Sequence, residues 1–118
     1  MTFILKGPVR GGKNHMLLDP RTGRHYPSSG WAAWRDQAVA QLWPQGCQRF
    51  TEPVSLLADY YPPDRRRRDA TALLDAVFHV LEHASILVDD SLVKEISWKE
   101  FPMDKENPRI ILTLDKIG

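Results

Sequence analysis

The chain has 118 residues, of which 42% are hydrophobic and 26% are charged. A chain of this length buries enough apolar surface to fold as one domain, spanning residues 1–118, without disulfides. Sixteen basic and fifteen acidic residues leave a formal net charge of +1, so overall charge selects no class of partner. The single cysteine, Cys47, excludes an internal disulfide. Because the sequence has no secretory leader and no apolar run long enough to cross a membrane, we expect a soluble cytoplasmic protein.

The first quarter of the chain predicts a strand followed by a basic loop. The opening TFILKG alternates and contains β-branched residues, which favours a short strand. The glycine-rich segment PVRGGKN follows, and residues 15–18 and 24–27 then flank DPRTG, whose Asp, Pro and Gly fit a tight connection. We therefore expect a basic hairpin or an Ω-like loop, and its basic residues are Lys13, Arg21 and Arg24.

Residues 30–43, GWAAWRDQAVAQLW, predict the first helix. Ser28 and Ser29 precede this segment and are good N-cap residues. Apolar residues recur along it at helical spacing, so we expect one face of the helix to be buried. The tryptophans that we expect in the core are Trp31, Trp34 and Trp43.

The rest of the chain predicts three strands and a second helix. EPVSLLADYY is interpreted as a strand that the following proline pair ends. The helix begins near Asp69 or Ala70, with Asp69 at the N-cap position, and carries an apolar stripe at i, i+3 and i+4 spacing. LVKEISWKEF and RIILTLDKI predict the last two strands, and we expect the turn PMDKENP to join them as a hairpin.

The order strand, helix, strand, helix, strand, strand indicates the fold class. A strand, helix and strand in succession favour a parallel crossover, whereas a terminal hairpin is antiparallel. We therefore predict an α/β or α+β domain with a small mixed sheet and two helices packed on it.

The segment PPDRRRRDATALLDAVFHVLEHASILVDD, residues 62–90, carries the strongest indication of function. The four adjacent guanidinium groups of Arg65 to Arg68 repel one another. Arginine also makes bidentate hydrogen bonds to phosphate oxygens, so the run predicts contact with a polyanion. Asp69 at the helix start and Asp90 after the return connection can supply oxygen ligands to a hard divalent ion such as Mg²⁺. A basic cluster beside such an acid suits a metal-dependent nuclease. From the residues alone, a simple N-cap at Asp69, a solvated Asp89-Asp90 turn and a solvated arginine loop remain alternatives.

Asp75, His79 and His83 form another candidate metal site, because their i, i+4 spacing places them on one helix face. That face lies opposite the apolar stripe and also carries Glu82. We therefore expect it to be an ordinary solvated surface rather than a transition-metal site.

Residues 62–93 resemble the RusA family of Holliday junction resolvases, small phage and prophage endonucleases that cut four-way DNA junctions. The arginine run ending in an acid, the following helix and the terminal DD ahead of a strand match the family in order and spacing. GGKN and GRHYPSSGWAAWRDQAV match its N-terminal basic loop and first helix more weakly. The resemblance implies a mixed sheet, a homodimer, hydrolysis of branched DNA that depends on Mg²⁺ or Mn²⁺, and paired nicks in recombination and repair.

Matched residue by residue, Asp69 occupies the position of the first motif acid and Asp90 that of the last. The family's second acid, its Asn and its Lys are replaced by Thr71, Ala72 and Asp75. Asp75 lies one helical turn beyond Thr71, and helical side chains lean toward the N-terminus, so its carboxylate can fill the space of an acid at 71. We therefore predict a catalytic and metal site of Asp69, Asp75 and Asp90. The DNA-binding residues predicted with it are Arg65, Arg66, Arg67, Arg68, Lys13, Arg21 and Arg24.

These departures from the motif leave other functions open. The loss of one of three carboxylates weakens the hold on a metal ion. The main alternative is therefore a catalytically weakened RusA-like protein that binds branched DNA without cutting it. A third interpretation is a phage protein that engages another anionic partner through the same surface.

Overall fold

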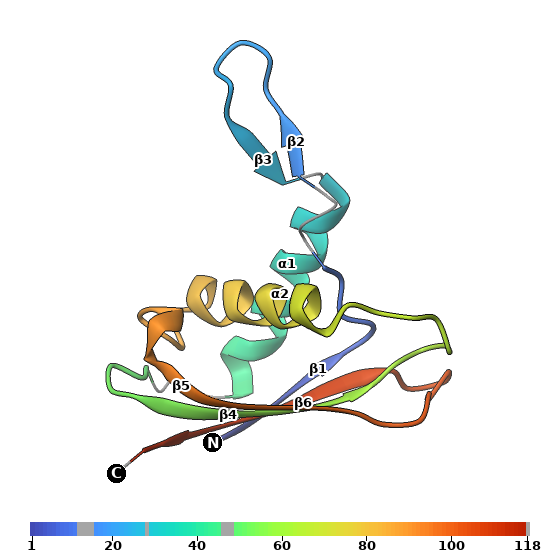
Figure 1. Cartoon of the computed structure of the whole chain (residues 1–118), viewed down its shortest axis with the longest axis vertical. Coiled ribbons are helices and arrows are strands. Elements are labelled where there is room, and N and C mark those ends of the chain that lie inside the picture. The colour runs from blue at the N-terminus through green and yellow to red at the C-terminus, as the bar shows by residue number, and fades with distance from the viewer. Residues whose placement is uncertain (12–15, 28, 46–48, 118) are drawn as a thin grey trace.

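A four-stranded sheet with two helices on one face forms the body of the chain (Figure 1). The structure is a computed structural model that describes residues 1–11, 16–27, 29–45 and 49–117. The sheet order is β1-β6-β4-β5, and β2 and β3 form a separate pair. The elements are β1 (Thr2–Lys6), β2 (Met16–Leu18), β3 (His25–Pro27), α1 (Ser29–Leu42), η2 (Trp43–Gln45), β4 (Val54–Tyr61), α2 (Ala70–His83), η3 (Asp90–Leu92), β5 (Val93–Glu100) and β6 (Arg109–Lys116). This arrangement confirms the predicted class, an α+β domain with a small mixed sheet and two helices.

Alternation along the strands decides which face of the sheet is buried. On β4 the even-numbered residues are buried, and β6 repeats the pattern, because successive side chains point to opposite faces. The apolar stripe of α2 lies in the same core as these strands. The fully buried side chains from the three elements include Val54, Leu56, Tyr60, Val77, Val80, Leu81, Ile110, Leu112 and Leu114. Among the described residues, neither helix has the length and apolar content that a membrane span requires.

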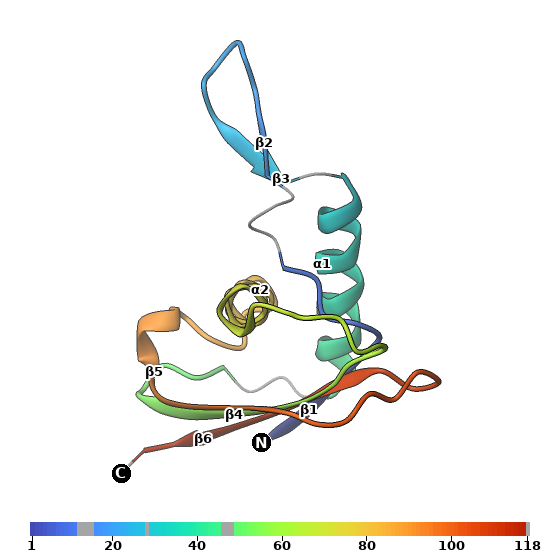
Figure 2. The same cartoon turned by 45° about the vertical axis from the view of Figure 1, so that its right-hand side comes forward.

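β4 and β5 are parallel neighbours, with Val54 opposite Val93 and Tyr60 opposite Glu100. The chain leaves the end of β4 and must travel back along the full strand before β5 can start. α2 provides this return, and Figure 2 shows it end-on above the sheet. The predicted strand–helix–strand crossover is therefore confirmed.

The predicted terminal hairpin is wrong. β6 lies between β1 and β4 and is antiparallel to both, so β5 pairs with β4 and not with β6. β6 places three large apolar side chains in the core, whereas every residue of β5 is at least partly exposed. The strand with an apolar face therefore takes a central position, and the charged strand VKEISWKE takes the edge.

The basic segment after β1 forms the predicted hairpin. β2 and β3 pair antiparallel, and the backbone N–H of Asp19 donates to the Arg24 carbonyl at 2.8 Å. The turn between them includes Gly23, whose φ of +70° is a conformation that glycine adopts readily. Figures 1 and 2 both show the hairpin projecting beyond α1, away from the sheet. Lys13 lies outside the described residues.

α1 begins and ends one residue earlier than predicted, at Ser29 and Leu42, so Ser29 is its first residue and not its cap. Ser28, the other predicted capping residue, lies outside the described residues. Trp31 is buried and Trp34 packs against the core, as predicted. Trp43 is a correction, because its side chain is 63% exposed. The helix ends at Leu42, and Trp43 begins a 3₁₀ turn from which its indole N–H donates to the Ala84 carbonyl at 3.2 Å.

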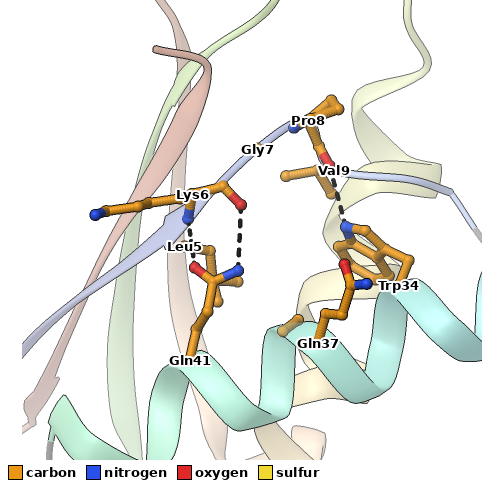
Figure 3. Close-up of a pocket in the computed structure, with 9 residues that line it drawn as sticks. Leu5, Lys6, Gly7, Pro8, Val9, Trp34, Gln37 and Gln41 are labelled. Carbon is orange, nitrogen blue, oxygen red and sulfur yellow. Dashed lines mark hydrogen bonds between the residues drawn. The ribbon is translucent and has the colours of Figure 1, made fainter.

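Two glutamines, Gln41 of α1 and Gln45 of η2, bond to the outer edge of β1. The Gln45 amide accepts from the Ile4 N–H and donates to the Ile4 carbonyl, both at 2.7 Å. The Gln41 amide does the same with Lys6, at 2.7 and 3.3 Å, as Figure 3 shows. A side-chain amide carries the same donor and acceptor as a peptide group, so these glutamines satisfy backbone groups that a further strand would otherwise use.

Tyr60 links β4 to the segment after β1. Its side chain is fully buried, burial raises the pKa of its hydroxyl, and that hydroxyl accepts from the Val9 N–H at 3.1 Å. Tyr60→Phe would leave this buried N–H unpaired, and we expect a loss of about 1–3 kcal/mol in the free energy of unfolding, measured by urea denaturation.

Tyr61→Phe is the matched control for this change. Tyr61 is half-buried on the other face of β4, and its hydroxyl makes no hydrogen bond to the described residues. We expect its removal to change stability by less than about 0.5 kcal/mol. Equal losses in the two variants would show that the Tyr60 hydroxyl has no special structural role.

Candidate metal and nucleic-acid site

Asp69 caps the N-terminus of α2. It has an extended backbone, with φ of −82° and ψ of 105°, and its Oδ1 accepts from the Thr71 N–H at 3.0 Å. The interpretation of Asp69 as an N-cap is therefore confirmed. Its side chain is still exposed, so the carboxylate also faces solvent just after the arginine run.

Three exposed carboxylates gather beyond the other end of α2. Glu82, Asp89 and Asp90 each offer an oxygen, and these oxygens lie within 4.8 Å of one another. Glu82 also accepts from the backbone N–H of Asp90 at 3.1 Å, and Asp89 caps η3 by accepting from the Ser91 N–H at 2.9 Å. The return of the chain after α2 therefore brings the Asp89-Asp90 pair against the last turn of the helix. We call these three residues the acidic cluster.

Mutual repulsion and hydrogen bonding shift the pKa values in the acidic cluster. The hydrogen bond with Asp89, partial burial and the charges of Asp89 and Asp75 raise the pKa of Asp90. Partial burial and the charge of Asp90 raise the pKa of Glu82. The pKa of Asp89 is lowered, chiefly because its carboxylate accepts from the Ser91 N–H. A divalent cation would relieve this repulsion, and the oxygen donors suit Mg²⁺ or Mn²⁺.

The three predicted site residues do not all meet within one chain. Asp75 is exposed on α2, close enough to Asp90 for its charge to raise the pKa of Asp90. Asp69 precedes a helix of 14 residues, which spans about 20 Å, and Asp90 contacts Glu82 near its far end. The structure thus separates the carboxylates of Asp69 and Asp90 by the length of α2, and the group of described carboxylates that contains Asp90 does not include Asp75.

The four arginines have different environments. Arg68 is held within its own loop, where it forms an ion pair with Asp64 and donates to the Arg66 carbonyl at 2.9 Å. A hydrogen bond from the Arg66 N–H and the Arg68 guanidinium lower the pKa of Asp64. Arg65, Arg66 and Arg67 are exposed, and only Arg66 approaches a described acid, at 3.9 Å from Asp64. Three guanidinium groups therefore remain available to an anion, while the fourth shapes the loop.

The projecting hairpin adds a second basic surface. Arg21 has 89% of its side chain exposed and lies 4.0 Å from Asp19, at the limit of an ion pair. Arg24 is also exposed. An exposed pair at this distance contributes little to stability, so both side chains can turn toward a ligand.

The histidines of α2 pack as aromatic rings. His79 meets the Trp31 ring edge-on, with 5.0 Å between centroids, and stacks on His83 at 5.9 Å. Partial burial, followed by the charges of Arg35 and His83, lowers the pKa of His79. The metal-type group found among the described residues contains Glu82 and not these histidines.

Sequence reasoning missed Glu82 and Asp89 as members of the cluster. Glu82 was assigned to a solvated helix face and Asp89 to a turn. Their spacing in the sequence was the available signal. Glu82 lies seven residues after Asp75, which is two helical turns along the same face. A short connection then separates Glu82 from the Asp89-Asp90 pair. Which way that connection turns is set by tertiary packing of its buried residues, Ile86 and Leu87.

The fold and these surfaces define an α+β domain with a cationic loop at one end of its central helix and a carboxylate cluster at the other. No protein-family model matches the chain. It is 30% identical over 107 residues to crossover junction endodeoxyribonuclease RusA of Escherichia coli strain K12, which covers 89% of this chain and 88% of that protein. The protein of the same name from Enterobacteria phage 82 is 29% identical over 108 residues, and the alignment covers 89% of this chain and 88% of that protein. The protein of that name from Shigella sonnei is 35% identical over 66 residues, which cover 56% of this chain and 54% of that protein. The chain belongs to the RusA family of crossover junction endodeoxyribonucleases.

Mn²⁺ binding to the acidic cluster should depend on pH. Because the pKa values of Glu82 and Asp90 are raised, these groups bind protons at a higher pH than free carboxyl groups do, and the protons compete with the ion. We expect Mn²⁺ to raise the melting temperature at about pH 7 and to have little effect at about pH 4.5, close to the ordinary carboxyl pKa.

Asp90→Asn tests the assignment of this effect, with Glu106→Gln in an exposed loop as its control. A folded-state pKa above the unfolded value means that ionisation of Asp90 lowers stability as pH rises through that range. Metal-free Asp90→Asn should therefore melt at a higher temperature than the native chain at about pH 7 and should lose the response to Mn²⁺. The same Mn²⁺ response in native and Asp90→Asn proteins would place the ion elsewhere.

Proposed function

We propose that the chain is a metal-dependent, structure-selective endonuclease that resolves four-way (Holliday) DNA junctions by paired nicks in recombination and repair. Membership of the RusA family supports the reaction class. The observation that carries the proposal is the acidic cluster. One of its members is Asp90, which occupies the position of the last motif acid. The reaction would take place in the cytoplasm of a bacterium or an infected cell.

The carboxylates proposed to hold Mg²⁺ or Mn²⁺ are Asp90, its neighbours Glu82 and Asp89, and the predicted partners Asp75 and Asp69. When bound, the cation supplies an activated water and neutralises charge on the phosphate. The protein's own contribution is positioning, because the hydrogen bonds from Asp90 to Glu82 and from Ser91 to Asp89 fix the cluster before a ligand arrives. The raised pKa of Glu82 also makes it a candidate to take a proton from water.

A site that uses both Asp69 and Asp90 requires two chains. The two residues lie at opposite ends of α2, so one copy cannot bring both to the same ion. A two-fold dimer can supply Asp69 from one copy and Asp90 from the other, and it then contains two such sites. A four-way junction has approximate two-fold symmetry, and paired nicks need two sites. The proposed assembly is therefore a homodimer.

The proposed DNA contacts come from the exposed basic residues on the loop before α2 and on the hairpin. Guanidinium groups bind phosphate oxygens and confer affinity for the backbone more than choice of sequence. Arg68 contributes by holding the loop in shape through Asp64. The residues that we propose to touch DNA are Arg65, Arg66, Arg67, Arg21, Arg24 and Lys13.

The second candidate function is a branched-DNA-binding protein with weakened or lost cleavage. Two observations favour it. Thr71 replaces the second motif acid, and the carboxylate of Asp69 is engaged as the cap of α2 at 3.0 Å from the Thr71 nitrogen. A carboxylate held in this way has fewer lone pairs available for a metal ion.

Cleavage of a synthetic four-way junction separates the two functions. We expect the native protein to nick the junction in Mg²⁺ or Mn²⁺, and we expect Asp69→Asn and Asp90→Asn each to lower the rate by at least about a hundredfold, because each removes a proposed metal ligand. Glu106→Gln is the control for loss of an exposed carboxylate and should cut at the native rate. Binding without nicking in either metal, together with nicking by Thr71→Asp, would establish the binder instead.

The basic loop should act through phosphate contacts that depend on salt. Arg67→Ala should weaken junction binding and reduce the slope of log affinity against log salt concentration by about 1. Lys6→Ala, which removes an exposed cation from β1, is the control and should leave the slope unchanged. Equal slopes in all three proteins, measured by fluorescence anisotropy, would show that the arginine loop does not contact DNA.

A further inference from the structure

The β2–β3 hairpin adds little to the core of the domain. The side chains of residues 18–24 are described, and none of them belongs to the buried core. Among the described residues, the hydrogen bonds of this segment all stay within the hairpin. Figures 1 and 2 show the hairpin projecting beyond α1, away from the sheet. A segment that covers so little apolar surface contributes little to stability, which indicates a role in contact with another molecule.

The turn of the hairpin is fixed by its own hydrogen bonds. The Asp19 N–H donates to the Arg24 carbonyl, and the Gly23 N–H donates to the Asp19 carbonyl, both at 2.8 Å. The Asp19 carboxylate accepts from the Arg21 N–H at 2.9 Å. The Thr22 hydroxyl accepts from the Arg24 N–H at 3.3 Å. The tip therefore has its shape before a ligand arrives, which lowers the entropic cost of binding.

The charge that the tip presents to its surroundings is positive. Arg21 has 89% of its side chain exposed, and Arg24 is also exposed. Asp19, the acid among residues 18–24, has only 29% of its side chain exposed and accepts from the Arg21 N–H. The tip is therefore complementary to an anionic surface, and the proposed function supplies one in the form of DNA.

A two-stranded ribbon fits one groove of DNA better than the other. Paired strands lie about 4.8 Å apart, and their side chains add to this width. The major groove is about 12 Å wide and admits such a ribbon, whereas the minor groove is only about 6 Å wide. Leu18 is 56% exposed, and the thymine methyl group, an apolar feature of the base edges, lies in the major groove. Width and apolar character thus both favour the major groove.

We infer that the β2–β3 hairpin enters the major groove of a duplex arm of the junction, where Arg21 reaches base edges and Leu18 contacts thymine methyl groups. This inference deepens the proposed function and rests on it for the identity of the ligand. Contacts to phosphates position a protein on DNA, whereas contacts to base edges carry sequence information. The hairpin would therefore give the protein a preference among arm sequences that the arginine loop before α2 does not provide.

Junctions with modified arms test which groove is occupied. Glucosylated 5-hydroxymethylcytosine fills the major groove, whereas 2,6-diaminopurine in place of adenine adds an amino group to the minor groove. Each modification is confined to the arms, away from the crossover, and binding by the whole chain is measured by fluorescence anisotropy without a divalent metal. We expect glucosylation to weaken binding by at least about tenfold, because it blocks the base edges, and we expect diaminopurine to have little effect.

A chain with a shortened hairpin assigns this effect to β2 and β3. Replacing residues 18–25 by Asn-Gly joins Leu17 to Tyr26, which are already paired, through a two-residue turn. Its melting temperature should stay within about 3 °C of the native value, because the described side chains that it loses lie outside the core. We expect this chain to bind plain and glucosylated junctions equally well.

Arg21→Gln repeats the test without altering the backbone. Its matched control is Lys105→Gln, which removes an exposed cation from the loop after β5. We expect Arg21→Gln to reduce the difference in affinity between plain and glucosylated junctions, and we expect Lys105→Gln to leave that difference unchanged.

Three results would each overturn the inference. They are equal binding of the native chain to plain and glucosylated junctions, a larger loss with diaminopurine than with glucosylation, and full discrimination by the shortened chain. Cleavage of the plain junction in Mg²⁺ is measured on the same native protein. If that protein discriminates as expected but cuts nothing, the groove contact stands and the proposed activity fails. If it cuts the junction but does not discriminate, the activity stands and the groove contact fails.

Discussion

The parallel pairing of β4 with β5 is the constraint on which the rest of the molecule depends. Two adjacent parallel strands require a crossover connection that returns the chain along the sheet, and the 14-residue helix α2 forms this connection. The same helix fixes where the chemistry lies, because its start carries Asp69 and the arginine loop, while its end meets Asp90. The separation of the motif acids Asp69 and Asp90 is therefore a direct result of strand order.

Much of the fold could be predicted because the relevant signals are local. Asp69 at a helix start, the i, i+3, i+4 stripe of α2 and the alternation along β4 each depend on neighbours in sequence, and the structure agrees with all three. The place of β6 could not be predicted, because alternation shows which face of a strand is buried but not which strand lies beside it. A short turn between β5 and β6 suggested a hairpin, yet the chain crosses β4 before β6 begins. Burial of Ile110, Leu112 and Leu114 decided the outcome.

The site was predicted less completely for a related reason. Asp90 was identified by its position after the helix, but spacing along a sequence does not reveal that a 14-residue helix holds its two ends far apart. Glu82 was assigned to solvent, and only the turn through Ile86 and Leu87 folds the DD pair back onto it. The four arginines were likewise treated as equivalent, whereas Arg68 forms an ion pair with Asp64 inside its own loop. Each omission reflects a contact between residues that the sequence alone does not place together.

The glutamine amides along β1 have a consequence for stoichiometry. A sheet with two open edges can add subunits without limit and so form fibres, which is a hazard for any protein with exposed strands. In this chain the amides of Gln41 and Gln45 already occupy backbone groups of Ile4 and Lys6, so the β1 edge offers a poorer template for such growth than an edge whose groups are all free.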